Sequence, residues 1–379
     1  MEIVECKRCV MNNTAQPFRV NSEGCNYCTP AILRIKNVLG KSRSDLLNIV
    51  SSIDRKESNP HGYNCVVGVS GGVDSSWLLA KAVKLGLKPL AVHMDNGWNS
   101  AQGSHNIYKL LSTLGVPLHT VVLDWHQQRR AQLAFLNANV VDVELLYDNA
   151  LQEVCYSVAR QYGIKTILGG NNSLSEGVEV GRNWVWHKWD GVNIRAILKK
   201  SRVSSANYPI FSFYRYLVYR YVWGIQWINL LDFIPEFGKE VALAELQRDY
   251  QYLPYGNKHF ENVFTRFYQG VILPEKFGVD KRRSHLSSQI VRGEITRSEA
   301  EALLRLDIYP SRALRRQDIE SICVKLGVTE AWLQDYLAQE KGSHRTYMHD
   351  PTVNYLIPLY SKAKSVIRQL TSRQSERNN

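Results

Sequence analysis

This sequence of 379 residues lacks the features that would place it in or across a membrane. Its first residues, MEIVECKRC, contain no basic segment followed by an apolar one, so we expect no signal peptide. The aromatic stretch 208–235 is interrupted by Arg215, Arg220 and Asp232, and its longest uncharged run after Arg220, Tyr221–Leu231, is too short to cross a bilayer. We expect this stretch to be a buried core helix or a subunit contact, with peripheral membrane attachment less favoured, and the chain to be cytoplasmic.

Acidic residues are few relative to basic ones. The chain has 35 Asp and Glu against 47 Lys and Arg, which gives a formal charge of +12 and a pI near 9.3. Residues 182–220 hold eight basic residues against one acid, and residues 276–316 hold ten against five. This charge suits an anionic partner such as a nucleotide, a phosphate, a nucleic acid or a membrane surface. A solvated basic face is the usual alternative.

Residues 64–76, NCVVGVSGGVDSS, carry the most specific signal. A short apolar run ends at Ser70, two glycines follow, and Asp74 opens an amphipathic stretch, which predicts a strand, a tight turn and a helix. Gly71 and Gly72 let the main chain approach an anion closely, and the N–H groups and dipole at the helix start favour negative charge. The loop lacks the lysine of a Walker A loop. A plain glycine turn with a capped helix is the alternative.

SGGVDSS resembles the SGGxDS signature of the PP-loop ATP pyrophosphatases. This resemblance implies that ATP is split into AMP and pyrophosphate and that Asp74 lies near Mg²⁺. Two further strand ends, MDNGWNS and GGNNSLSEG, are expected to join the loop, although each is also a good turn sequence. The expected ATP-binding residues are Ser70, Gly71, Gly72, Asp74, Ser75, Ser76, Met94, Asp95, Gly170 and Asn171.

From residue 64 onward, short apolar strands alternate with helices. After the first strand we expect strands at 89–95, 119–124 and 165–171, which predicts an α/β fold with a doubly wound, mostly parallel sheet. Ligands bind beyond the carboxyl ends of the strands in such sheets. From about Tyr208 strand signals end and helices dominate, including one capped at Thr296 or Ser298.

This pattern divides the chain into three parts. Residues 1–35 form a cysteine-bearing module, residues 60–205 the PP-loop domain, and residues 206–379 a helical C-terminal region for substrate or partner contacts. We find no convincing internal repeat.

Four of the seven cysteines follow a C-x2-C-x15-C-x2-C spacing. Each pair can present two sulfurs to one ion, which predicts a structural zinc site with no open ligand position. The metal would stabilise a section too short to bury much core. Iron–sulfur ligation is the alternative, and disulfides are not expected without a secretion signal. The expected ligands are Cys6, Cys9, Cys25 and Cys28; Cys65, Cys155 and Cys323 are expected to be buried and inert.

The wider pattern resembles the N-acetyl sugar amidotransferase family of lipopolysaccharide and O-antigen biosynthesis. The resemblance rests on CKRCVMNNT, SGGVDSS, HMDNGWNS, LGGNNSLSEG and EKFGVDKRRSHLSSQIVRGEITRSEA, which together span most of the chain up to residue 305. It implies that the acetamido oxygen of a nucleotide-linked sugar is adenylated and then replaced by ammonia, which gives an acetamidino sugar. Basic regions would bind the sugar diphosphate, and Lys188, between tryptophans, would neutralise the departing pyrophosphate unless it is a cation–π pair. The tentative substrate-binding residues are Glu176, Lys276, Arg282, Arg283 and His285.

No GxCxG nucleophile segment is present, so the chain carries no recognisable ammonia generator. As in the family, we expect a separate class I glutaminase subunit, with the stretch 208–235 as one guess for its contact. A PP-loop tRNA-modifying enzyme of the 2-thiolase type is the alternative, but thiolation needs paired cysteines near ATP, and those outside the N-terminal set are far apart in sequence. A noncatalytic nucleotide-binding scaffold is a third possibility, and a nucleic-acid partner is not expected.

Overall fold

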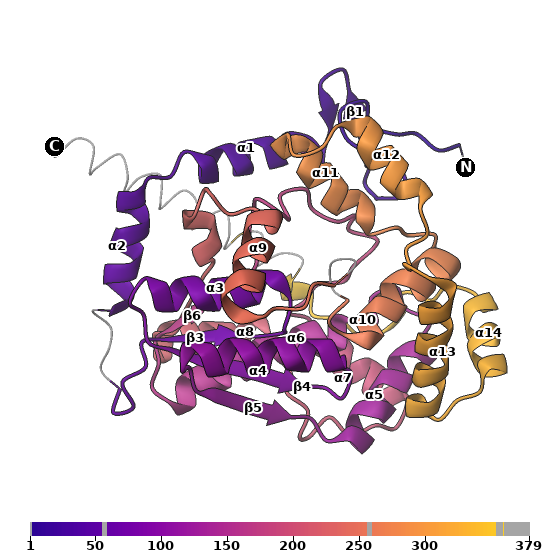
Figure 1. The fold of residues 1–379 in the computed structure, drawn as a ribbon. Helices are drawn as coiled ribbons and strands as arrows, with labels where there is room; N and C mark the ends of the chain where they lie inside the picture. The colour runs from indigo at the N-terminus through magenta and orange to yellow at the C-terminus, as the bar shows by residue number, and fades with distance from the viewer. Residues whose placement is uncertain (1, 55–58, 256–259, 354–358, 360–379) are drawn as a thin grey trace.

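A five-stranded parallel sheet forms the centre of the computed structural model, which describes residues 2–54, 59–255, 260–353 and 359 (Figure 1). The strand order is β5-β4-β3-β6-β7, and every neighbouring pair is parallel. Residues 64–69 and 89–94 are almost wholly buried apolar runs, as strands covered on both faces require. The strands are β3 (Cys65–Gly68), β4 (Pro89–Asp95), β5 (Leu118–Val122), β6 (Thr166–Leu168) and β7 (Gln226–Ile228).

Helices cover both faces of the sheet. From β3 the chain adds β4 and then β5 on one side, and it then adds β6 and β7 on the other side of β3. Because crossovers between parallel strands are right-handed, this change of direction places the connecting helices on opposite faces of the sheet. On one face, α3 (Val73–Lys84), α4 (Ala101–Leu114) and α9 (Lys239–Tyr250) pack together. On the other, α6 (Leu145–Gln161) lies against β3, β4 and β6 and packs on α7 (Gly191–Lys200), which also contacts α5 (Trp125–Asn137).

The predicted α/β fold with its doubly wound parallel sheet is confirmed. The expectation that strand signals end at Tyr208 is wrong, because β7 lies in the aromatic stretch 208–235 and pairs with β6 through Thr166–Gln226, Ile167–Trp227 and Leu168–Ile228. The same stretch is not one core helix either. It consists of α8 (Phe213–Leu217), the π-helical η1 (Val218–Val222), β7 and the 3₁₀-helical η2 (Leu230–Phe233). The sheet therefore extends past residue 205, where the sequence places the end of the PP-loop domain.

Helices make up most of the C-terminal region. The elements are α10 (Val263–Phe267), the π-helical η3 (Tyr268–Phe277), α11 (Arg282–Arg292), α12 (Arg297–Arg305), α13 (Arg312–Leu326), α14 (Glu330–Ala338) and the 3₁₀-helical η4 (His344–Thr346). Helix α12 begins at the predicted cap: the Thr296 hydroxyl accepts from the Glu299 N–H, and the Glu299 carboxylate accepts from the Thr296 N–H. Helices α13 and α14 lie at the side of the molecule toward which the strands point (Figure 1).

The N-terminal section is a short hairpin followed by two helices. Strands β1 (Val20–Asn21) and β2 (Gly24–Cys25) pair antiparallel, and α1 (Cys28–Leu39) and α2 (Arg43–Asp54) follow. Helix α1 packs on α11 (Figure 1). The four N-terminal cysteines belong to the same buried apolar cluster as α6, α7 and the C-terminal helices. Among the described residues, no helix is long and apolar enough to cross a bilayer.

Candidate functional site

The loop between β3 and α3 folds as the sequence predicts. Gly71 has a φ of +85°, and Gly72 is the N-cap residue of α3. The Ser70 hydroxyl accepts from the Gly72 N–H at 3.2 Å, and the Ser75 hydroxyl lies 3.1 Å from Ser70 and donates to the Gly72 carbonyl. Because the cap residue is glycine, no cap side chain occupies the N–H groups of the first turn of α3. The loop is therefore shaped to present these donors to an anion.

Close packing surrounds both glycines, and at Gly71 it leaves no room for a larger residue. A Cβ on Gly71 would lie 2.7 Å from the carbonyl oxygen of Gly103 in α4, and its φ is one that L side chains rarely adopt. A Cβ on Gly72 would lie 2.7 Å from Oε1 of Glu261. Glu261 therefore places a carboxylate directly against the loop.

Two tyrosines, the buried Tyr252 and the partly buried Tyr255, hold the carbonyl of Gly71. The Tyr252 hydroxyl donates to it at 2.9 Å, and the Tyr255 hydroxyl at 3.2 Å. Burial raises the pKa of both hydroxyls, and the negative charge of the Glu261 carboxylate raises it further. The Asp74 carboxylate adds to the increase in the pKa of Tyr252. Both hydroxyls stay protonated donors. Asp74 and Glu261 thus lie on the same small part of the molecule, and their two carboxylates could hold a Mg²⁺ ion beside the loop.

The end of β4 lies next to the loop. The His93 ring is 2.8 Å from the Val69 carbonyl through Nδ1 and 2.8 Å from the Asn99 amide through Nε2, so Nδ1 carries the proton and Nε2 accepts. The Asp95 carboxylate accepts from the Gly97 N–H at 2.9 Å, and Met94 is buried. A cavity of about 630 Å³ has His93, Asp95 and Asn99 among its lining residues. The rest of its lining comes from α4 and residues 115–118, and no residue of the loop 70–76 lines it.

The third predicted strand end also reaches the loop. The Cβ position of Gly170 lies 3.5 Å from the main-chain N of Ser75, so β6 ends against the first turn of α3. The Asn171 amide donates to Glu176 at 3.3 Å. The structure therefore brings the predicted residues of all three strand ends together at one edge of the sheet, with Glu176 beside them.

The C-terminal region completes this edge. The Ser100 N–H donates to the Glu261 carbonyl at 3.0 Å, the Val263 N–H donates to the Trp98 carbonyl at 2.9 Å, and Asn99 and Asn262 form an antiparallel bridge. Sequence reasoning missed Glu261 because a single glutamate in HFENVF belongs to no motif. Tyr252 and Tyr255 were missed for the same reason.

Lys188 lies in a separate charged cluster. Its ammonium is 2.7 Å from Asp142 and 2.8 Å from Asp148, which precede and begin α6. Burial alone would lower the pKa of Lys188. The attraction to the two carboxylates is stronger and raises this pKa above its usual value. The Asp142 carboxyl is itself buried, yet the Lys188 charge and hydrogen bond hold its pKa below the usual value. Among the described residues, no hydrogen bond or ion pair joins Lys188 to residues 70–76.

The tentative substrate-binding residues of α11 and its surroundings are engaged in packing contacts. Lys276 is buried, and its ammonium donates to the Tyr336 and Gln339 carbonyls at the end of α14. Arg282 pairs with Asp280 at 2.8 Å and donates to the carbonyls that end α12. His285, on the same helix, is partly buried.

Arg283 ties α11 to the cysteine module. Its guanidinium is 2.8 Å from Glu5 and donates to the Val10 carbonyl at 2.7 Å, while the Ser287 hydroxyl accepts from the Val10 N–H at 3.3 Å. Residues of α11 therefore join the C-terminal region to the N-terminal cysteine module.

The four N-terminal cysteines form a compact cluster. Their sulfurs lie within 4.8 Å of one another, and the closest pairs are 3.7 to 3.9 Å apart. Four sulfurs about 2.3 Å from a single tetrahedral zinc ion lie about 3.8 Å from one another, so the arrangement fits one ion. Main-chain N–H groups of Arg8, Cys25 and Cys28 point at these sulfurs, as expected around thiolates. Cys6, Cys9, Cys25 and Cys28 could therefore hold one metal ion.

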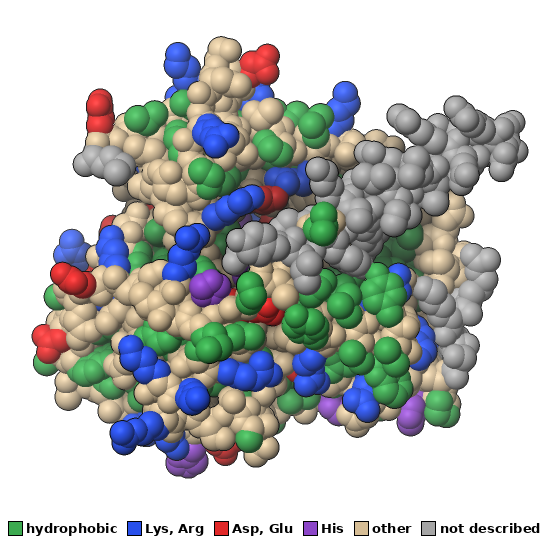
Figure 2. Space-filling view, turned by 180° about the vertical axis from the view of Figure 1, so that it is seen from behind, with side chains coloured by type: hydrophobic (Ala, Val, Ile, Leu, Met, Phe, Trp, Pro, Cys, Tyr) green, Lys and Arg blue, Asp and Glu red, His purple; other side chains and the backbone are tan. Residues whose placement is uncertain are grey.

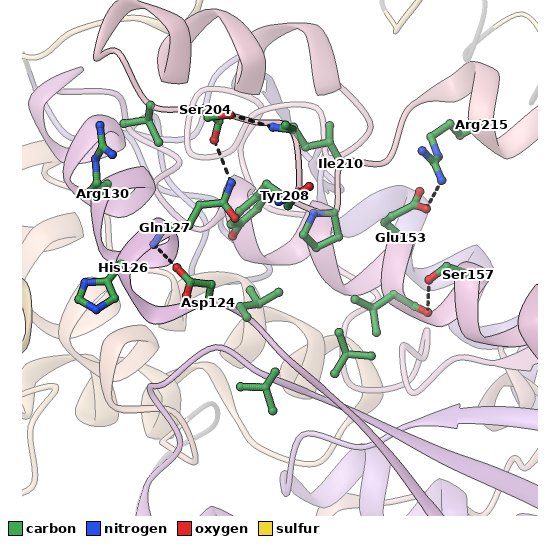
Figure 3. Close-up of a pocket in the computed structure, with 18 residues that line it drawn as sticks. Asp124, His126, Gln127, Arg130, Glu153, Ser157, Ser204, Tyr208, Ile210 and Arg215 are labelled. Atoms are coloured by element: carbon green, nitrogen blue, oxygen red, sulfur yellow. Dashed lines mark hydrogen bonds and ion pairs between the residues drawn. The ribbon is translucent and has the colours of Figure 1, made fainter.

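A cavity of about 860 Å³ lies beyond the end of β5 (Figure 3). Figure 3 shows Arg130, Gln127 and His126 of α5 on one side and Glu153 and Ser157 of α6 on the other. No residue of the loop 70–76 lines it. It is therefore separate from the candidate ATP site.

Comparison with known proteins bears on the C-terminal region. Residues 261–362 match the family model for the C-terminal domain described as "LPS biosynthesis protein WbpG-like". We call this region, which is similar to that family's C-terminal domain, the WbpG-like domain. The match confirms the predicted relation to a lipopolysaccharide-biosynthesis family. Glu261, the carboxylate against the loop, is the first residue of the WbpG-like domain.

The other comparisons add little. No curated protein matches the chain. Among solved structures it is similar to the NMN synthetase from Francisella tularensis, with 17% identity and a TM-score of 0.29, over 60% of this chain and 99% of that one. It is also similar to the NH3-dependent NAD synthetase from Campylobacter jejuni subsp. jejuni NCTC 11168 in complex with the nitrate ion, with 13% identity and a TM-score of 0.28, over 59% and 99%. These scores are too low to support a statement about function.

Proposed function

We propose that the chain is an ATP-dependent, AMP-forming amidotransferase that acts on an acetamido nucleotide sugar for lipopolysaccharide synthesis. The observation that carries this proposal is the loop 70–76 with Glu261 of the WbpG-like domain packed on Gly72. A loop of the SGGxDS type provides ATP activation, and the WbpG-like domain indicates surface-polysaccharide synthesis.

In the first step the acetamido oxygen of the sugar attacks the α-phosphorus of ATP. An O–P bond forms, the bond between the α- and β-phosphates breaks, and pyrophosphate leaves. The loop N–H groups and the first turn of α3 bind the pyrophosphate end and need no reorganisation as charge moves onto it. Asp74 and Glu261 would hold Mg²⁺, which supplies positive charge against the phosphates. Asp95, at the end of β4, orients the nucleoside.

In the second step ammonia adds to the imidate carbon, AMP leaves, and a proton is lost to give the acetamidino group. The amide oxygen is a poor leaving group, and adenylation converts it into part of a good one. The chain contributes mainly positioning, because holding two reactants in attack geometry is worth several powers of ten in rate. We propose that a separate glutaminase subunit supplies the ammonia.

The 2-thiolase alternative finds no support among the described residues. Cys65, Cys155 and Cys323 are all buried, and burial raises the pKa of Cys155 to about 12. Such thiols are poor sulfur carriers.

The proposed reaction is tested by AMP and pyrophosphate release with an acetamido nucleotide sugar and ammonium. We expect release to need both compounds, and Asp74→Asn or Glu261→Gln to lower its rate at least about a hundredfold. Each variant should unfold at the wild-type temperature. Asp335→Asn, at an exposed position of α14 outside the site, is the matched control and should keep the wild-type rate. Turnover that requires tRNA instead of the sugar would contradict the proposal.

A further inference from the structure

One helical face outside the candidate ATP site exposes apolar and aromatic side chains. Helix α8 runs directly into η1, and residues 214, 218, 221 and 222 follow one another along the outer side of this continuous helix. Large apolar side chains so exposed in a group usually mark a contact surface. Tyr214, Val218, Tyr221, Val222 and Trp223 are 57, 48, 63, 74 and 38% exposed.

Cations surround these side chains. The Arg160 guanidinium lies 4.5 Å from the centre of the Trp223 ring, Lys165 donates to the Trp223 carbonyl at 2.9 Å, and Arg220 lies 5.8 Å from the Tyr221 ring. The chain contains no Asp or Glu from residue 191 to residue 231. Figure 2 shows such groups of hydrophobic side chains with Lys and Arg between them on one face of the molecule. We call the five exposed residues with Arg160, Lys165 and Arg220 the basic–aromatic patch.

The inner side of the same helix is fixed in the core. Phe213, Tyr216 and Tyr219 are buried, and the Tyr219 hydroxyl donates to Glu153 at 2.7 Å. Arg215 pairs with the same carboxylate. The patch is therefore presented by a firmly packed element, and its exposed residues carry little of the fold's packing.

The patch lies at the edge of the sheet opposite the ATP loop. Lys165 comes directly before β6, and η1 ends just before β7, whose first residue Gln226 pairs with Thr166. The loop 70–76 follows the carboxyl end of β3 instead. A partner bound at the patch would therefore have the whole length of the strands between it and the loop 70–76.

We propose that the basic–aromatic patch binds the surface of an anionic lipid bilayer. Tyrosine and tryptophan rings favour the bilayer interface, where the ring is in apolar surroundings and the polar atom is in water. Each nearby Lys or Arg adds attraction to anionic headgroups. When the patch is bound to the bilayer, the opposite edge of the sheet, where the strands have their carboxyl ends, stays open to soluble substrates. Attachment of this kind is independent of which reaction the ATP loop serves.

The test is co-sedimentation of the full chain with lipid vesicles. We expect binding to vesicles of phosphatidylcholine with about one third phosphatidylglycerol, none to phosphatidylcholine alone, and weaker binding as salt is added. The double change Val222→Ser with Trp223→Ser should lower the partition coefficient about tenfold. Lys165→Gln and Arg220→Gln should each lower it about fivefold.

Matched controls separate the patch from general charge and apolarity. Val324→Ser on α13 removes an apolar side chain that is 79% exposed, and Arg312→Gln removes an exposed cation on the same helix. Both should bind vesicles like the wild type. The proposal is overturned if the chain does not bind anionic vesicles, if the patch variants bind as the wild type does, or if the patch binds an acidic protein but no vesicle.

Discussion

At the scale of single residues, Lys188 is held by two carboxylates, one of them fully buried. Lys188→Met would leave Asp142 buried without its main partner, and we expect the free energy of unfolding to fall by about 3 kcal/mol. Adding Asp142→Asn should restore much of that loss. Denaturant unfolding measures both effects.

Kinetics distinguish this structural role from the catalytic one that the sequence suggests. If Lys188 neutralises the departing pyrophosphate, Lys188→Met lowers kcat and leaves stability unchanged. A loss of stability that the second substitution repairs identifies the ammonium as a partner of the buried carboxylate.

The buried His344 should make the free energy of unfolding depend on pH. Its Nδ1 donates to Asn193 at 2.7 Å, its Nε2 faces the Asp142 N–H, and its ring stacks on Trp186. Burial lowers the pKa of His344 from 6.5 to about 4. The unfolded chain therefore takes up this proton first, and the stabilisation present above pH 6.5 is lost as the pH falls toward 4.

The expected loss is about 3 kcal/mol at this residue. Thermal melting from pH 7 to pH 4 measures it. His344→Phe keeps the stack on Trp186 and should be less stable at pH 7 but show a weaker pH dependence. An unchanged slope in this variant would show that other groups cause the acid sensitivity.

The residues that sequence could reveal are those whose chemistry fixes their spacing. Gly71, Gly72 and Asp74 stand next to one another, and the cysteines come in pairs, so local pattern is enough. Glu261 acts on the same loop from 187 positions beyond Asp74. Only the folded chain brings the two together, and no local pattern could reveal it.

At the scale of elements, the basic side chains of α11 make packing contacts with other parts of the fold. Arg283→Ala removes the contacts to Glu5 and Val10, and we expect it to lower the free energy of unfolding by about 1–2 kcal/mol and to speed metal loss from the cysteines. Chelator-induced zinc release, followed with a coloured zinc indicator, measures the second effect. The control is Arg316→Ala, on an exposed helix face.

The sequence assigns Arg283 tentatively to substrate binding, and the same variant tests that role. A raised KM for the nucleotide sugar with unchanged stability and unchanged metal release would favour the substrate role over the packing role.

Strand β7 could not be predicted from the local sequence pattern. Its three residues, Gln226, Trp227 and Ile228, are all only partly buried and lie among aromatics, so neither length nor alternation marks a strand. Pairing with β6 decides their conformation, and pairing depends on residues about 60 positions earlier in the chain. Of the strands that were predicted, β3, β4 and β6 are buried apolar runs, and β5, although not buried, is rich in β-branched residues.

At the scale of the whole molecule, the cysteine cluster is part of the main core. We expect the purified chain to contain one zinc ion, measured by atomic absorption. Chelation should lower the melting temperature of the whole chain by roughly 10 °C in a single transition, because the cysteines share their apolar cluster with α6 and the C-terminal helices.

Cys25→Ser should lose the metal, and Cys323→Ser, outside the cluster, should keep it. Iron with acid-labile sulfide in the purified chain would contradict a zinc site and favour the iron–sulfur alternative.

The antiparallel contact between residues 98–100 and 261–263 has a consequence for how the protein is made. The loop 70–76 emerges from the ribosome long before Glu261, and synthesis proceeds from the N-terminus at about 5–20 residues per second. The sheet can begin to form while one wall of the candidate nucleotide site has not yet been translated. An unfinished or truncated chain that ends before residue 261 therefore carries the loop 70–76 without the carboxylate that packs on it, and the candidate site is complete only when the WbpG-like domain has docked.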